Sequence, residues 1–109
     1  MSYPKIDEFT DNQQEIALFA KALSHPARIA IIELLARRKT CYSGNIADEI
    51  PLSRTTVSQH LQELKKSGIV KGEIEGQKVE YCIHAENFNR LKLLLEEFLC
   101  CQQILKSNC

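Results

Sequence analysis

Three of the five cysteines lie near the C-terminus, at Cys100, Cys101 and Cys109. Soft thiolate ligands select soft, thiophilic ions. Three sulfurs in a pyramid suit trivalent arsenic or antimony, so we expect As(III) or Sb(III) as a bound effector and no constitutive cofactor. Oxidation of the same thiols is an alternative chemistry. A third interpretation is that they only pack, because buried cysteine often serves as a small hydrophobe.

The spacing of these cysteines sets a condition on ion binding. Consecutive residues on a helix diverge by about 100°, and on a continuous helix Cys109 would lie about 12 Å beyond Cys101. One ion cannot bridge that distance. The tail must therefore fold back, or the sulfurs must come from two subunits, and either change would disturb the C-terminal helix.

The remaining cysteines and the other candidate histidines give no indication of catalysis. Cys41 stands alone and Cys82 is expected on the polar side of a strand, so both are interpreted as structural or incidental, as are His25 and His60. An odd number of cysteines in a presumed reducing compartment predicts free thiols rather than a disulfide framework. The sequence has neither a Cys-x-x-Cys pair nor a Gly-rich anion loop, which argues against an enzyme.

A second set of side chains lies on a helix predicted to begin after Ser53. Val57, Leu61 and Leu64 form its apolar stripe at steps of four and three residues. The opposite face carries one guanidinium, two hydroxyls and two amides: Arg54, Thr55, Ser58, Gln59 and Gln62. In the major groove of duplex DNA, arginine pairs with guanine and glutamine with adenine. We therefore predict that this face contacts double-stranded DNA, although polar residues also cover many helices that bind nothing.

The charge balance qualifies this prediction. The 14 basic and 14 acidic residues give a net charge of zero, whereas phosphate neutralisation supplies most non-specific DNA affinity. Lys71 and Lys78, on the predicted hairpin, are expected to contact phosphates. Weak non-specific binding is the expectation, and an interaction module of the same fold without DNA binding or an inducer site is the alternative.

Periodicity and capping residues predict the elements that position these groups. Ser24, Ser43 and Ser53 are predicted N-caps, and Gly68 is predicted to follow the end of the DNA-reading helix. Helices are expected at 11–23, 27–36, 43–50 and 53–67, strands at 69–75 and 79–83, and a last helix from 85 almost to the end. The order α-α-α-α-β-β-α, mainly α with a small β-hairpin, predicts one winged helix-turn-helix domain over residues 1–109.

The first and last helices are predicted to form a dimer. The last carries Phe88, Leu91, Leu95 and Phe98 at alternating steps of three and four, a helix-packing pattern. Packing of this helix on its own domain is the alternative. A two-fold homodimer would favour an inverted-repeat operator. No apolar run reaches the roughly 18 residues of a membrane span and no secretory signal is evident, so a cytoplasmic location is expected.

Three segments together resemble the ArsR/SmtB family of metal-responsive repressors: AKALSHPARI (20–29), LSRTTVSQHL (52–61) and LKKSGIV (64–70). The resemblance covers roughly residues 15–83. It implies a homodimeric transcriptional repressor that releases its operator when an ion or oxidant reaches a sensing site. It also places the family's DNA-reading positions at Arg54, Thr55, Ser58 and Gln59.

This sequence departs from two sensing sites known in that family. Arsenical and cadmium sensors carry a Cys-x-Cys pair near the third helix, where only Cys41 is present, and zinc sensors use a histidine on the last helix, where none follows His84. The C-terminal cysteines are similar to the arsenite site of some members, which uses an adjacent pair and a third cysteine a few residues on.

Overall fold

The helices and strands lie close to where the sequence predicts them. A computed structural model describes residues 8–38, 46–75 and 78–100. In chain order the elements are α1 (Asp11–Ala22), α2 (Pro26–Arg37), η2 (Ile46–Asp48), α3 (Arg54–Lys66), β1 (Val70–Glu75), β2 (Lys78–Ile83) and α4 (Ala85–Cys100). This order confirms a mainly helical winged helix-turn-helix fold. The described part of the third predicted helix is only a single 3-10 turn, η2.

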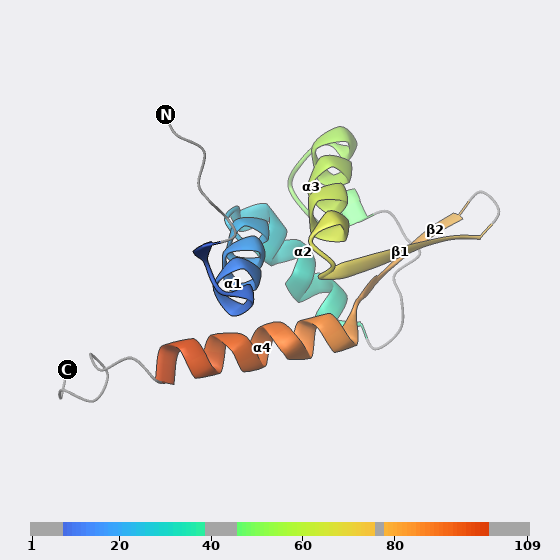
Figure 1. The fold of residues 1–109 in the computed structure, drawn as a ribbon. Coiled ribbons are helices and arrows are strands. Elements are labelled where there is room, and N and C mark those ends of the chain that lie inside the picture. The colour runs from blue at the N-terminus through green and yellow to red at the C-terminus, as the bar shows by residue number, and fades with distance from the viewer. Residues whose placement is uncertain (1–7, 39–45, 76–77, 101–109) are drawn as a thin grey trace.

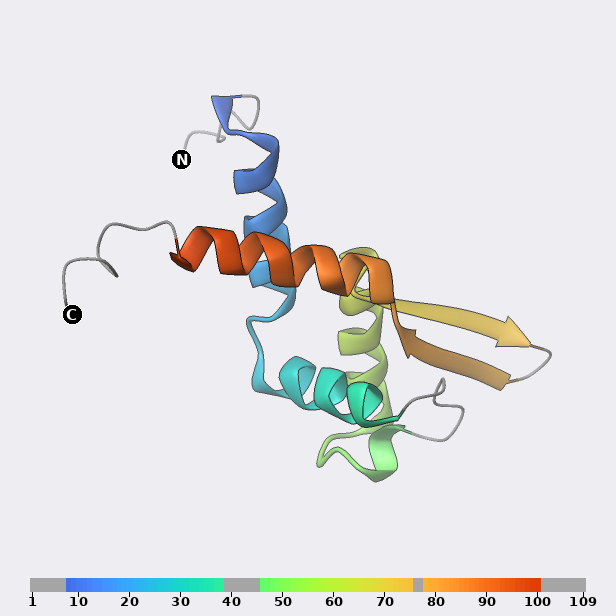
Figure 2. The same ribbon diagram turned by 90° about the horizontal axis from the view of Figure 1, so that it is seen from below.

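The β1–β2 hairpin and the C-terminal end of α4 lie far apart in the fold. Helix α4 crosses α1 in Figure 2 and runs below it in Figure 1, and in both views the hairpin extends away from the helices. The C-terminal end of α4 lies on the side opposite to the hairpin. The antiparallel strands pair Val70 with Ile83 at the base and Glu75 with Lys78 near the turn.

The core lies between α2, α3 and the base of the hairpin. The largest fully buried side chains of the described residues are Ile31, Leu34, Leu64, Ile69 and Val70. Phe19 of α1 and Leu91 and Leu94 of α4 belong to the same apolar cluster. Truncating a fully buried leucine such as Leu64 to alanine would cost about 2–5 kcal/mol. The apolar stripe of α3 is therefore the element that fixes which face of this helix points outward.

The start of α2 corrects one prediction. The N-cap is His25 rather than Ser24, and its Nδ1 accepts a hydrogen bond from the Ala27 N–H at 3.0 Å. Pro26 occupies the first helical position, where its missing N–H is not needed, so the residue before it becomes the cap. Ser24 Oγ instead donates to the Lys21 carbonyl at 2.6 Å.

Cys82 corrects a second prediction. Its side chain was expected on the polar side of β2 as a free thiol, but it is only 8% exposed and forms a disulfide. The alternation argument fails because both faces of β2 are covered near its end, where Tyr81 and Ile83 also pack against the core.

Candidate DNA-binding surface

The reading face of α3 is solvent-exposed over its whole predicted extent. Val57, Leu61 and Leu64 are buried on one side of α3. The five residues of α3 that were predicted to contact DNA are all exposed, and we call them the reading face: Arg54, Thr55, Ser58, Gln59 and Gln62. The structure thus brings these five side chains to one solvent-facing side of a single helix.

The N-terminus of α3 is fixed by the predicted cap. Ser53 Oγ accepts a hydrogen bond from the Thr56 N–H at 3.3 Å and donates to Thr56 Oγ1 at 3.0 Å. These bonds occupy the half-buried Thr56 hydroxyl, while Thr55 stays exposed on the reading face. A capped helix N-terminus also presents a positive dipole end that favours a phosphate.

The hairpin contributes one described lysine side chain. Lys71 is exposed on β1, opposite Cys82 in the strand register. Lys78 begins β2 beside the turn, but its side chain lies outside the part of the chain that the structure describes. Both lysines therefore belong to the β1–β2 hairpin, the wing that comes directly after the reading helix α3 in the chain.

Arg28 joins the reading helix to α1 and α2, which sequence reasoning did not find. Its Nε donates to His60 Nδ1 at 3.1 Å, and its Nη1 donates to the carbonyls of Lys21 and Ala22 at 3.2 and 3.4 Å. His60 is 9% exposed and its ring centroid lies 4.4 Å from that of His25. Burial, then the neighbouring His25 and Arg28, lowers the pKa of His60. The neutral ring is therefore favoured, and it can accept the bond that holds α3 in place.

Large apolar side chains are also exposed on the first and last helices, α1 and α4. We call this set the apolar face, formed by α1 and α4: Leu18, 51% exposed, Leu93, 64%, Phe98, 47%, and Leu99, 53%. Of the four predicted dimer residues on α4, Leu91 is buried in the chain's own core and Phe88 and Leu95 pack against that core partly buried. Only Phe98 is exposed, so most of the predicted dimer pattern packs on the chain's own domain instead. Among the described helices none is long and apolar enough to cross a membrane.

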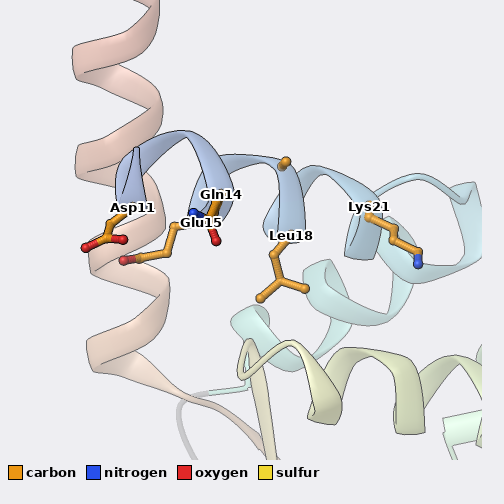
Figure 3. Close-up of a pocket in the computed structure, with 6 residues that line it drawn as sticks. Asp11, Gln14, Glu15, Leu18 and Lys21 are labelled. Carbon is orange, nitrogen blue, oxygen red and sulfur yellow. The ribbon is translucent and has the colours of Figure 1, made fainter. Parts of the chain in front are cut away.

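A shallow hollow lies along α1, next to Leu18 of the apolar face. It has a volume of about 620 Å³ and follows α1, where Leu18 lies between charged and amide side chains (Figure 3): Asp11, Gln14, Glu15 and Lys21. Glu15 accepts two hydrogen bonds from Arg90 of α4, at 2.5 and 2.7 Å. This ion pair lowers the pKa of Glu15 and raises that of Arg90, and it ties the two helices of the face together.

The predicted thiol site is described only in part. Cys100 is the last residue of α4, and its thiol is free and exposed. Cys101 and Cys109 lie outside the described residues. Within residues 8–38, 46–75 and 78–100 no three His, Cys, Asp or Glu side chains gather as a metal site.

Comparisons with known proteins define the class of this chain. Residues 23–73 match a helix-turn-helix domain family. An uncharacterized HTH-type transcriptional regulator of Mycobacterium tuberculosis is 32% identical over 83 residues, which are 76% of this chain and 73% of that protein. The chain is a transcriptional regulator with a winged helix-turn-helix DNA-binding domain.

Two solved structures narrow the class to a family. A possible transcriptional regulator for arsenical resistance is 26% identical with a TM-score of 0.63, over 72% of this chain and 80% of the other. The homodimeric winged helix-turn-helix domain of a possible ArsR-family regulator from Mycobacterium bovis is 28% identical with a TM-score of 0.62, over 91% and 88%. The chain belongs to the ArsR family of transcriptional regulators, as the sequence resemblance predicted.

Proposed function

We propose that the chain is a homodimeric repressor whose two α3 helices read an inverted-repeat operator in successive major grooves. The observation that carries this proposal is the reading face: five exposed hydroxyl, amide and guanidinium groups on a helix whose other side is buried. Arginine and glutamine can each make two hydrogen bonds to a base edge there. The capped N-terminus and Lys71 supply contacts to the flanking phosphates.

The apolar face supports the dimer. Exposed leucine and phenylalanine side chains on α1 and α4 would be removed from water by a second copy, at roughly 25 cal/mol per Å² of apolar surface buried. The related Mycobacterium bovis domain is homodimeric. A two-fold axis through this face would place two reading helices on one side of a DNA duplex.

A gel-shift titration tests this function. The probe is the duplex upstream of the protein's own gene, and the competitor is a scrambled duplex of equal composition. Specific complexes of this kind have dissociation constants of about 10⁻⁸ to 10⁻¹¹ M, and their affinity falls steeply with added salt. Absence of salt-sensitive retardation of either duplex would instead support an interaction module without DNA binding.

We further propose that a thiophilic inducer, As(III) or Sb(III), releases the protein from DNA by binding Cys100, Cys101 and Cys109. The support is chemical: three thiols suit a soft pyramidal ion, and the described one, Cys100, is free and exposed at the end of a helix on the apolar face. One related structure belongs to a possible regulator for arsenical resistance. Ion binding that rearranges this helix end would disturb the dimer that holds both reading helices in place.

The inducer proposal is tested by titrating arsenite into the operator complex and following fluorescence anisotropy. Wild-type protein should dissociate, whereas Cys100→Ser, Cys101→Ser and Cys109→Ser should each need more arsenite while binding DNA normally. A Glu97→Gln variant, at an exposed position of α4 without a thiol, serves as the control. Unchanged arsenite sensitivity in all three variants would remove the site.

Thiol oxidation is the second candidate signal. The observation that favours it is the disulfide at Cys82, which lies at the base of the wing. Diamide and dithiothreitol, applied to the same operator complex, separate the two signals. Oxidant-dependent release that is lost in Cys82→Ser supports this candidate, and arsenite-dependent release that survives in Cys82→Ser supports the C-terminal site.

A further inference from the structure

The C-terminal end of the reading helix is joined directly to the first turn of α4. Gly68 follows α3 with a φ of +84°, a left-handed conformation that glycine adopts without strain. Its carbonyl accepts a hydrogen bond from Asn87 Nδ2 at 2.8 Å. The next carbonyl, of Ile69, accepts from the His84 N–H at 2.8 Å. Two consecutive carbonyls at the end of α3 are thus held by the residues that start α4.

The Asn87 side chain is itself placed by this turn. His84 Nδ1 accepts from the Asn87 N–H at 3.3 Å, and the His84 carbonyl accepts from the Phe88 N–H at 2.8 Å, so His84 caps the first turn. A Cβ on Gly68 would lie 2.8 Å from Asn87 Nδ2. A larger residue at position 68 would therefore clash with the Asn87 amide, and a residue without an N–H donor at position 87 could not bond the Gly68 carbonyl.

We propose that Asn87 is a positioning residue for DNA recognition: its bond to the Gly68 carbonyl fixes α3 to α4 and thereby sets the separation of the two reading helices in the dimer. This inference rests on the proposed function, in which α4 belongs to the dimer face and α3 enters the groove. The base of the hairpin still connects the two helices when the bond is absent. The bond removes the remaining freedom of α3 to tilt.

The consequence concerns operator spacing. Moving one half-site by one base pair shifts it about 3.4 Å along the duplex and rotates it around the axis. A dimer with firmly held reading helices discriminates against that shift, and a dimer with tilting helices tolerates it. Loss of the Asn87 bond should therefore flatten the spacing preference in addition to weakening binding.

The experiment uses an inverted repeat selected from random duplexes with wild-type protein, and two versions with one base pair added or removed at its centre. Asn87→Ala should bind the selected duplex about fivefold more weakly, the value of one net hydrogen bond. The ratio of affinities for selected and altered spacing should fall at least twofold. Asn89→Ala, an exposed neighbour on α4, is the control and should retain both values.

Three readouts distinguish the outcomes. Light scattering and circular dichroism establish that each variant is a folded dimer. If Asn87→Ala unfolds, Asn87→Asp replaces it, because the aspartate side chain has the same size but cannot donate a hydrogen bond when ionised. An unchanged spacing ratio in the folded variant overturns the positioning role, even if all affinities fall together. Failure of the wild-type protein to bind any duplex specifically would instead contradict the proposed function.

Discussion

Two exposed surfaces of this protein differ in chemistry although both lie on helices that bury their other side. The reading face of α3 offers hydroxyl, amide and guanidinium groups, whereas the apolar face of α1 and α4 offers leucine and phenylalanine. Polar groups that stay hydrated until they meet another polar surface suit DNA. Large exposed apolar groups suit a protein partner. The contrast assigns a different kind of partner to each surface.

The largest expected effect comes from placing charge on the apolar face. Leu93→Glu combined with Phe98→Glu should convert the dimer into a monomer, since a carboxylate at the interface would lose its hydration. A monomer reaches only one half-site, so affinity for the inverted repeat should fall by about 100-fold or more. Sedimentation and anisotropy measure the two effects. Ile29→Glu, an exposed apolar site on α2, should remain dimeric, and a dimeric Leu93/Phe98 variant would contradict this assignment.

The next effect comes from the reading face. Arg54→Ala should weaken operator binding by about 10- to 100-fold, because a bidentate arginine–guanine pair contributes about 1–3 kcal/mol of discrimination. Binding to scrambled DNA should change much less. Glu63→Gln, on the same helix outside the reading face, is the control for anisotropy titrations on both duplexes. An equal loss on both duplexes would make Arg54 a phosphate contact without a role in sequence recognition.

A smaller effect concerns pH and the stability of α3. The pKa of His60 is lowered from 6.5, chiefly by burial and also by His25 and Arg28, so the unfolded chain binds the proton more readily. The contribution of neutral His60 to the free energy of unfolding is complete above pH 6.5. It is lost as the pH falls from there toward the folded-state pKa. His60→Asn should flatten the pH dependence of urea unfolding between pH 7 and pH 5. An unchanged profile would mean that another group causes it.

The smallest effect is expected at the Glu15–Arg90 ion pair. Both partners are partly exposed, at 31% and 55% of the side chain, and such surface pairs contribute little and are screened by salt. The lowered pKa of Glu15 means that its contribution is present above pH 4.5 and is lost as the pH falls through the folded-state value. Glu15→Gln should lower the melting temperature slightly at low salt and not at high salt. A large, salt-independent loss would contradict a surface ion pair.

Local sequence patterns predicted the fold and the reading helix well. Ser53 was predicted as a cap from its position before an apolar stripe, and Gly68 from its position after the last turn; the structure confirms both, with a cap hydrogen bond and a positive φ. These features depend on residues three to fifteen positions apart, within reach of periodicity and capping rules.

Contacts between distant residues could not be predicted in this way. The Arg28–His60, Gly68–Asn87 and Glu15–Arg90 bonds join residues 32, 19 and 75 positions apart. No periodic pattern specifies which polar side chains meet once helices pack. Cys82 was mistaken for a solvent-facing residue because alternation assumes one covered face, whereas its strand enters the core.

Site-specific photo-crosslinking tests the assignment of the two surfaces most directly. A benzoylphenylalanine is placed at Gln62 on the reading face in one protein and at Leu93 on the apolar face in another, and each is irradiated with the selected inverted repeat. The probe at position 62 should capture DNA, and the probe at position 93 should capture a second copy of the chain. A protein crosslink from position 62, or a DNA crosslink from position 93, would contradict it.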